Sequence, residues 1–336
     1  MEYSLGQSGL INRREAIRRT VVFSTGLLAA RWAGAAGAQG TPPAAGFPAG
    51  GMHLLALADF GYGNKAQAAV AAGMATFARG LGAPLTGVLA LGDNFYKTLT
   101  PERFQTGFEA MYPASDFACP FHLVLGNHDY GPGYDSGQGA DKAQMQLDYA
   151  QANPASRWKL PAKWYALELP DPARPLVKII FLDSNLTEPV LTPQEKLDQQ
   201  RFLEAELQKG TTAPWTWIAA HHPLFSDGPH GDNTTLIKRW GPCLADSEAS
   251  LYLCGHDHTL QHLEVPAYRA SFVVTGAGGA GLHDLHDTGR GYTQKIFGFT
   301  HLHVTTEAVD VQYLDTEGRR LHAFRRDRQG RVEVTT

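Results

Sequence analysis

Five short apolar runs in this 336-residue chain each end at side chains that bind metal ions. The runs are rich in Val, Leu and Ile and stop near Gly or Pro, which is typical of buried strands. Ligands of open α/β sheets bind beyond the carboxyl ends of the strands, so we expect these polar residues to converge on one point. The runs and the residues that follow them are 54–58 with Asp59, 88–91 with Asp93, 123–125 with Asn127 and His128, 217–220 with His221, and 251–254 with His256 and His258.

The composition excludes several classes of protein. The net charge is −4 and the basic residues are scattered, so we expect no nucleic-acid partner. Beyond the N-terminal region no stretch of about 18 uncharged apolar residues occurs, which argues against an integral membrane protein. The cysteines Cys119, Cys243 and Cys254 allow at most one disulfide bond, so a disulfide scaffold is excluded.

The N-terminal segment 1–38 has the pattern of an export signal. Arg13-Arg14 precedes an apolar stretch at 21–30, and Ala36-Gly37-Ala38 offers a cleavage site. The arginine pair resembles a bacterial twin-arginine signal; a Sec signal or a membrane anchor is the alternative, although Arg31 interrupts any longer apolar helix. We therefore expect an exported, periplasmic or secreted protein with no stable membrane insertion after processing, and a Pro/Gly/Ala linker at 39–51.

The remaining chain reads as one layered α/β catalytic domain at 52–326, followed by a tail at 327–336. Strands alternate with helices early in the chain, and hairpins dominate late. Thr192 and Glu195 form a capping box that opens a helix ending near Gly210. Other expected elements are helices at 63–81 and from Thr100-Pro101, a strand at 176–182, and a C-terminal antiparallel meander at 300–305, 309–314 and 321–325.

The residue types after the strands favour a site for two metal ions. Each motif alone has a structural explanation, such as a helix cap at Asp59 or a turn at Gly92-Asp93. Together, carboxylates, an amide and imidazoles suit hard or borderline ions such as Fe, Mn and Zn. Six or seven ligands are too many for one tetrahedral ion, and Asp93 is the natural bridge between two. Two cations about 4 Å apart can clamp the oxygens of a phosphoryl displacement.

Five segments also resemble, in order, the signature motifs of the metallophosphoesterases. Tyr96 narrows the resemblance to the purple acid phosphatases, most like the small tartrate-resistant acid phosphatase type. The resemblance runs from about residue 51 to about residue 326 and implies an α/β, four-layer sandwich of two mixed β-sheets flanked by helices. The segments are Asp59-Phe60-Gly61, Gly92-Asp93-Asn94-Phe95-Tyr96, Gly126-Asn127-His128-Asp129, Ile218-Ala219-Ala220-His221 and Gly255-His256-Asp257-His258.

The resemblance implies particular metals and a mechanism. Fe(III) would be held by Asp59, Asp93, Tyr96 and His258, and a second divalent Fe, Zn or Mn by Asp93, Asn127, His221 and His256. Metal-bound hydroxide would attack phosphorus in line. His128 would contact the phosphate, and His230, nine residues after His221, would protonate the leaving group.

The leading function is thus an acid phosphatase that hydrolyses small phosphate monoesters and releases inorganic phosphate. A phosphodiesterase or nucleotide hydrolase on the same scaffold, or a catalytically silent phosphate-binding protein, are the alternatives. We expect His222 to point away from the metals, and Asp257 either to face away or to orient the loop. His283 and His286 could approach the pocket, but we expect them to be loop histidines without a role. The segment from Asp183 to Thr192 is shorter than the regulatory loop of similar animal enzymes, so regulation by its cleavage is not expected.

Overall fold

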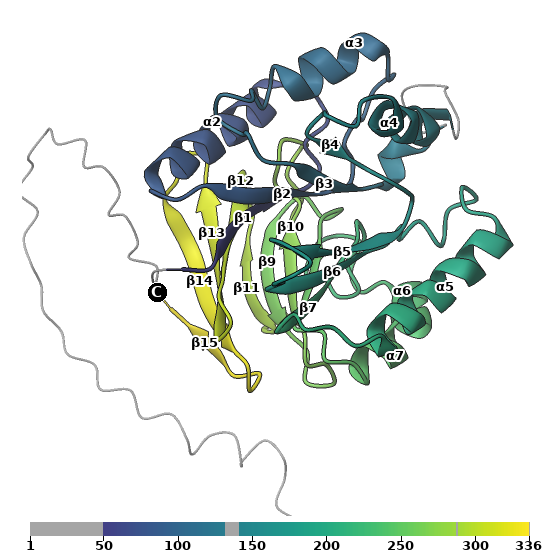
Figure 1. Ribbon diagram of the computed structural model, residues 1–336, viewed down its shortest axis with the longest axis vertical. Coiled ribbons are helices and arrows are strands. Elements are labelled where there is room, and N and C mark those ends of the chain that lie inside the picture. The colour runs from purple at the N-terminus through teal and green to yellow at the C-terminus, as the bar shows by residue number, and fades with distance from the viewer. Residues whose placement is uncertain (1–49, 132–140, 287, 336) are drawn as a thin grey trace, which may run out of the picture. The chain divides into compact units, whose positions relative to one another are not determined.

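The computed structural model describes residues 50–131, 141–286 and 288–335, all within one compact unit. The export signal, nearly all of the linker and most of the glycine-rich segment 131–139 lie outside the described residues. Two mixed sheets face each other (Figure 1). The first has, in spatial order, β15 (Val332–Val334), β14 (Arg320–Asp327), β13 (Ala308–Asp315), β12 (Gly298–Val304), β1 (Met52–Leu57), β2 (Leu85–Leu91), β3 (Phe121–Val124) and β4 (Trp158–Lys159).

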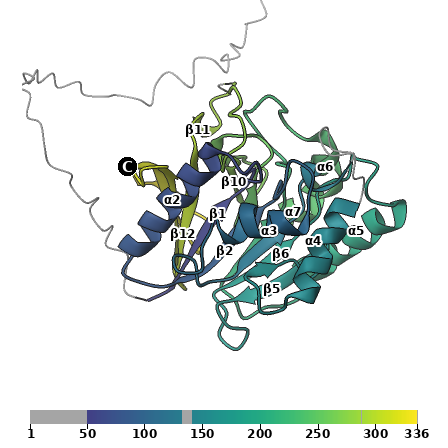
Figure 2. The ribbon, with the colours of Figure 1, turned by 90° about the horizontal axis from the view of Figure 1, so that it is seen from above.

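The second sheet is covered by its own helices. Figures 1 and 2 show α2, α3 and α4 over the outer face of the first sheet, and α5, α6 and α7 beside the second. The strands of the second sheet are, in spatial order, β11 (Gly291–Gln294), β9 (Leu260–Glu264), β10 (Ser271–Thr275), β8 (Leu251–Cys254), β7 (Trp215–Ala219), β6 (Val177–Phe181) and β5 (Tyr165–Leu169). The helices are α2 (Lys65–Gly80), α3 (Pro101–Phe104), the π-helix η2 (Gln105–Glu109), the 3-10 helix η3 (Asn127–Asp129), α4 (Asp141–Ala152), α5 (Pro193–Gln208), α6 (Thr234–Arg239) and α7 (Gly241–Ala245).

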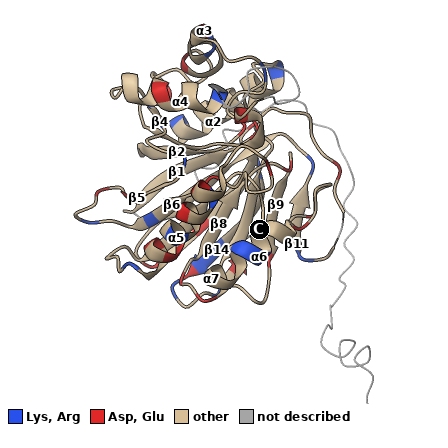
Figure 3. Ribbon diagram, turned by 90° about the vertical axis from the view of Figure 1, so that its right-hand side faces the viewer, with Lys and Arg blue, Asp and Glu red and all other residues tan. Residues whose placement is uncertain are grey.

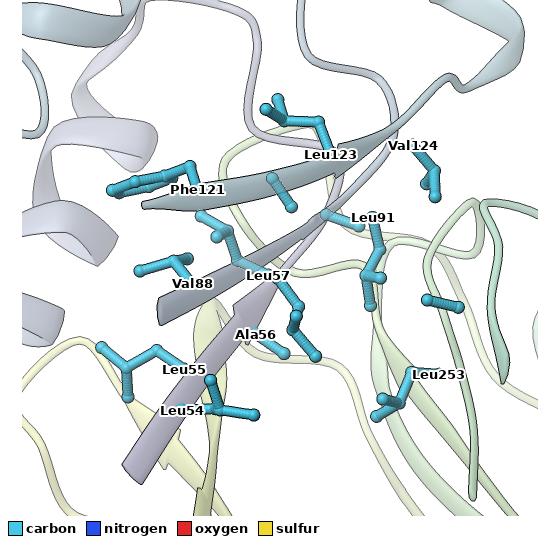
Figure 4. Close-up of a cluster of buried hydrophobic side chains, with 14 of the residues drawn as sticks. Leu54, Leu55, Ala56, Leu57, Val88, Leu91, Phe121, Leu123, Val124 and Leu253 are labelled. Carbon is cyan, nitrogen blue, oxygen red and sulfur yellow. The ribbon is translucent and has the colours of Figure 1, made fainter. Parts of the chain in front are cut away.

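The core lies between the two sheets and beneath the helices. All six residues of β1 are buried, because a strand with a helix on one face and a sheet on the other has no face in water. Figure 4 shows apolar side chains of β1, β2 and β3 with Leu253 of β8 nearby. This packing fixes the ends of the central strands, which position the residues that follow them.

The four-layer α/β sandwich implied by the family resemblance is confirmed. The capping box at Thr192 and Glu195 is present, and the C-terminal meander forms β12, β13 and β14. The helix expected after Thr100 is only one α-turn before it continues as η2. The first sheet also continues beyond residue 326, because β15 pairs with β14 inside the expected tail.

Cys119, Cys243 and Cys254 are all free thiols. Among the described residues, no helix is long and apolar enough to cross a membrane. Figure 3 shows acidic and basic residues interspersed around α5.

Candidate metal centre

The expected polar residues converge because their strands run parallel and end together. β1, β2 and β3 are parallel neighbours in the first sheet, as are β7 and β8 in the second. Backbone hydrogen bonds join the sheets at this edge: the N–H of Ala58 donates to the carbonyl of Thr275 at 2.9 Å. Asp59, Asp93 and His256 have φ angles of 59°, 54° and 67°. Such left-handed backbone in non-glycine residues is costly and is concentrated at functional sites.

One group of side chains surrounds Asp59. Its carboxylate accepts a hydrogen bond from the Tyr96 hydroxyl at 3.1 Å and lies 3.4 Å from Nε2 of His258. The Tyr96 hydroxyl is also 3.1 Å from the same His258 nitrogen. Ligand atoms of Asp59, Asp93 and His258 lie within 4.8 Å of one another, which is close enough to hold one ion. Tyr96 therefore lies where the first predicted ligand set requires it.

A second group surrounds the side-chain oxygen of Asn127. This oxygen is 3.0 Å from Nε2 of His221 and 3.0 Å from Nδ1 of His256. Nδ1 of His221 lies 2.9 Å from the carbonyl oxygen of Leu91, so it carries the proton and Nε2 presents a lone pair. The Nε2 lone pair of His221 then faces the side-chain oxygen of Asn127, which is also an acceptor. Either a proton or a cation must lie between these two atoms. Asp93 joins the two groups, since its Oδ1 lies 3.5 Å from Nε2 of His221.

Two glycines allow the strand ends to approach this closely. A β-carbon on Gly126 would lie 2.1 Å from Oδ1 of Asp93. One on Gly255 would lie 2.5 Å from Oδ2 of Asp59. Any side chain at these positions would displace the two carboxylates, which explains why glycine follows β3 and β8 here.

The electrostatics of the cluster favour positive charge. Burial opposes protonation of His258, but the Asp59 carboxylate outweighs it and raises the pKa of His258 to about 9. The pKa of His221 is likewise raised, against burial, chiefly by Asp93. Burial together with Asp59 and Asp93 raises the pKa of the Tyr96 phenol well above its ordinary value. A phenolate ligand therefore requires a cation in the cluster, and the donor set fits a metal centre.

The two expected catalytic histidines flank this cluster. The His128 ring lies 4.6 Å from the Tyr96 ring, and its backbone N–H donates to Asp93 at 2.9 Å. The His230 ring lies 4.2 Å from the His256 ring. Nδ1 of His230 donates to Oδ1 of Asp257 at 2.6 Å, which leaves Nε2 free of that contact. His128 is partly buried and the His230 side chain is 49% exposed, so both lie near the mouth of the site.

Three further residues, Asp257, His283 and His222, lie beside the cluster. Asp257 is buried and accepts hydrogen bonds from Ser226 and His230, so it orients a histidine. The His283 ring stacks on His258 at 3.9 Å, and its Nδ1 accepts the His258 N–H. His222 does not point away: its ring lies 4.2 Å from His256 while Nδ1 contacts Ser184 at 2.8 Å.

Comparison with known proteins agrees with this geometry. Residues 52–260 match the model of the calcineurin-like phosphoesterase family. The chain belongs to the calcineurin-like phosphoesterases. The expectation of an enzyme that acts on phosphoesters is thus confirmed, and the metal-ligand clusters agree with it.

Similar proteins place this phosphoesterase near the purple acid phosphatases. It is 27% identical over 315 residues to tartrate-resistant acid phosphatase type 5 of Sus scrofa, covering 84% of this chain and 88% of the relative. It is 25% identical to purple acid phosphatase 4 of Arabidopsis thaliana, covering 82% and 84%. The resemblance found in the sequence is therefore confirmed, and these relatives imply a binuclear metal centre.

Solved structures support the fold. A purple acid phosphatase from yellow lupin (Lupinus luteus) seeds superimposes with a TM-score of 0.61 at 16% identity, over 84% of this chain and 55% of the lupin chain. GAP50, an anchor in the inner membrane complex of Plasmodium, superimposes with a TM-score of 0.68 at 20% identity, over 81% and 87%.

Proposed function

We propose that this phosphoesterase is an acid phosphatase that hydrolyses small phosphate monoesters at a binuclear metal centre. The observation that carries the proposal is one cluster of candidate metal ligands with His128 and His230 on its flanks. The ligands of this cluster are Asp59, Asp93, Asn127, His221, His256 and His258. A monoester has more charged non-bridging oxygens than a diester, so it gains most from a site rich in cationic partners. Its product is inorganic phosphate.

The metal ligands are proposed as two sets that share Asp93. Asp59, Asp93, Tyr96 and His258 would hold Fe(III), because a phenolate is a strong anionic donor. Asp93, Asn127, His221 and His256 would hold a divalent Fe, Zn or Mn, because the amide and the imidazoles are neutral. When bound, the two ions supply Lewis-acid chemistry, which acidifies water and neutralises phosphate charge.

The histidines perform the remaining steps. His128 would donate a hydrogen bond to a non-bridging phosphate oxygen. Its ring lies beside that of Tyr96, at the edge of the metal cluster, which supports this role. His230 would transfer a proton from Nε2 to the leaving oxygen while Asp257 fixes Nδ1. The carboxylate thus sets the tautomer and the orientation of the acid.

We expect Tyr96→Phe to lose a visible absorption band while the protein stays folded. The phenol is fully buried between Tyr62 and His258, and Phe keeps the ring packing but removes the oxygen that gives a tyrosinate-to-iron transition. Absorption spectra of both proteins, purified in parallel, measure this. Tyr62→Phe is the matched control and keeps the band; an unchanged Tyr96→Phe spectrum contradicts the Fe(III) assignment.

The proposed activity is tested by comparing matched esters on the purified holoenzyme. We expect phenyl phosphate to be hydrolysed with a kcat/KM about 100-fold or more above that of diphenyl phosphate. The reason is that the histidines can bind the additional negative charge of the monoester. The reverse order would favour a phosphodiesterase. No turnover of either ester, with two metals bound, would favour a phosphate-binding protein.

Export through a twin-arginine signal is the third part of the proposal. Arg13 and Arg14 precede the apolar stretch, and Arg18 and Arg19 form a second pair in the same segment. We expect Arg13→Lys with Arg14→Lys to leave the protein in the cytoplasmic fraction of a bacterial host. Arg18→Lys with Arg19→Lys is the control and keeps periplasmic or secreted enzyme; equal export of both would reject the signal.

A further inference from the structure

A cavity of about 200 Å³ opens at the amino ends of β7, β8 and β10. The candidate metal ligands follow the carboxyl ends of β7 and β8, so the cavity lies at the opposite end of the same strands. The five residues of β7, at roughly 3.3 Å each, separate the two sites by about 16 Å. The end of β14 closes the cavity from the first sheet. No residue of the candidate metal centre lines it.

The cavity contains a buried arginine whose charge is poorly compensated. Arg326 is only 2% exposed, and its Nη1 donates to the Ser271 hydroxyl at 2.9 Å. Its Nε has no hydrogen-bond partner, and Arg326 forms no ion pair with any described carboxylate. Glu264 is linked to it only through Ser271, which donates to Glu264 at 2.5 Å. Buried charges are normally paired directly, so Arg326 is a cation of the cavity lining without a directly paired carboxylate.

Two further arginines line the same cavity. The Arg328 guanidinium lies 5.6 Å from the centre of the Trp215 ring, which favours a stacked orientation. The Arg269 side chain donates to the backbone carbonyl oxygen of Arg328 at 2.8 Å, so it is held against the backbone that carries Arg328. The three arginines come from the loop before β10 and from the end of β14, and all of them line one cavity.

The two carboxylates at the cavity do not neutralise it. Glu248 is 82% exposed and contacts Arg269 at 3.0 Å. Asp327 is already bound by Arg331, which lies outside the cavity lining, at 2.6 Å. The lining thus has three cations against two anions, one of which has its own cation, and the excess charge is positive.

We propose that this cavity is an oxyanion site that binds the phosphate group of a small molecule. Guanidiniums match phosphate oxygens with paired, charge-assisted hydrogen bonds. A water occupies about 30 Å³ of liquid, so the cavity has room for a phosphate with a small organic group. The site is separate from the proposed catalytic centre and does not depend on its metals.

Equilibrium dialysis with radiolabelled inorganic phosphate on the holoenzyme tests the proposal. We expect the wild type to bind one phosphate per chain more than Arg269→Gln/Arg328→Gln, in which affinity at the cavity falls at least tenfold. Both arginines are on the rim, so the double variant avoids the buried position. Arg326→Gln is expected to lose the same site, and a folded core is checked by circular dichroism.

Arg325→Gln is the matched control. Arg325 lies next to Arg326 in β14 but pairs with Asp310 at 3.0 Å and does not line the cavity. Arg325→Gln removes one positive charge, as Arg326→Gln does, and is expected to keep the wild-type number of phosphates. Equal phosphate binding by the wild type and the rim double variant overturns the proposal, whether or not the metal centre also binds phosphate.

A second probe identifies the source of the phosphate group. Phenylphosphonate resists hydrolysis and carries a phosphate-like group on an organic ring. Its binding to the same arginines would indicate a site for phosphorylated small molecules, and binding of inorganic phosphate alone would indicate a site for the free anion. Both results support an oxyanion site, and both require the loss in Arg269→Gln/Arg328→Gln.

Discussion

Asp93→Asn is expected to bind at most one metal ion per chain and to lower kcat about 1,000-fold, because a bridging carboxylate supports several kcal/mol of Lewis-acid stabilisation. Asn has the same shape but no charge. Asp93 is 1% exposed, faces His221 at 3.5 Å and also clusters with Asp59 and His258, so it is the carboxylate that joins the two ligand groups. Metal analysis by mass spectrometry and steady-state kinetics on one preparation measure both effects.

Asp315→Asn is the matched control for Asp93→Asn. Asp315 is also 1% exposed, but it lies at the end of β13 and pairs with Arg319 at 2.7 Å. Its amide is expected to keep two metals and the wild-type kcat. Full metal content in Asp93→Asn would contradict the bridging role, even if activity were lost.

The strand ends could be predicted from the sequence because the physical signal is local. A run such as 88–91 followed by Gly92 and Asp93 contains both the buried strand and the residue beyond it. The parallel register then brings Asp59 and Asp93 together without any long-range detail. The four-layer arrangement is a different case, since it came from the family resemblance and not from the spacing of apolar residues.

The side-chain directions beyond those strands could not be predicted. His222 follows His221, and simple alternation points it away, but the chain leaves the strand there and the ring turns toward His256. His256 has a positive φ of 67°, which no sequence rule assigns to a histidine. The neighbouring Asp257 is therefore directed at His230. One general signal was available for this pair: histidines at metal sites commonly donate a ring N–H to a nearby carboxylate.

Several elements were missed because their sequences are weakly periodic. α4 begins beside the segment 132–140, which lies outside the described residues. β4 has only two residues. β9 begins two residues after His258 and pairs antiparallel with β10. β4 is an edge strand of the first sheet, where tertiary packing outweighs local preference.

His230→Ala is expected to lower kcat/KM roughly 100- to 10,000-fold for alkyl phosphates, whose alkoxide leaving groups need a proton. For 4-nitrophenyl phosphate, whose leaving group is stable without one, the loss is expected to be several-fold only. The physical reason is that Nδ1 of His230 is fixed by Asp257 at 2.6 Å, so Nε2 is the one nitrogen able to deliver the proton. Kinetics on a series of esters with leaving groups of graded pKa give the slope that measures this.

Two companion variants separate proton donation from mere packing. Asp257→Asn keeps the shape of the side chain that His230 contacts but removes its charge. It is expected to make kcat/KM depend more steeply on the pKa of the leaving group, by a smaller amount than His230→Ala does. His286→Ala is the control, because this exposed histidine belongs to the same loop as His283; it is expected to leave all esters unchanged. An equal loss for alkyl and nitrophenyl esters in His230→Ala would assign this histidine to phosphate binding instead, since a group that only holds phosphate has no preference for the alcohol that departs.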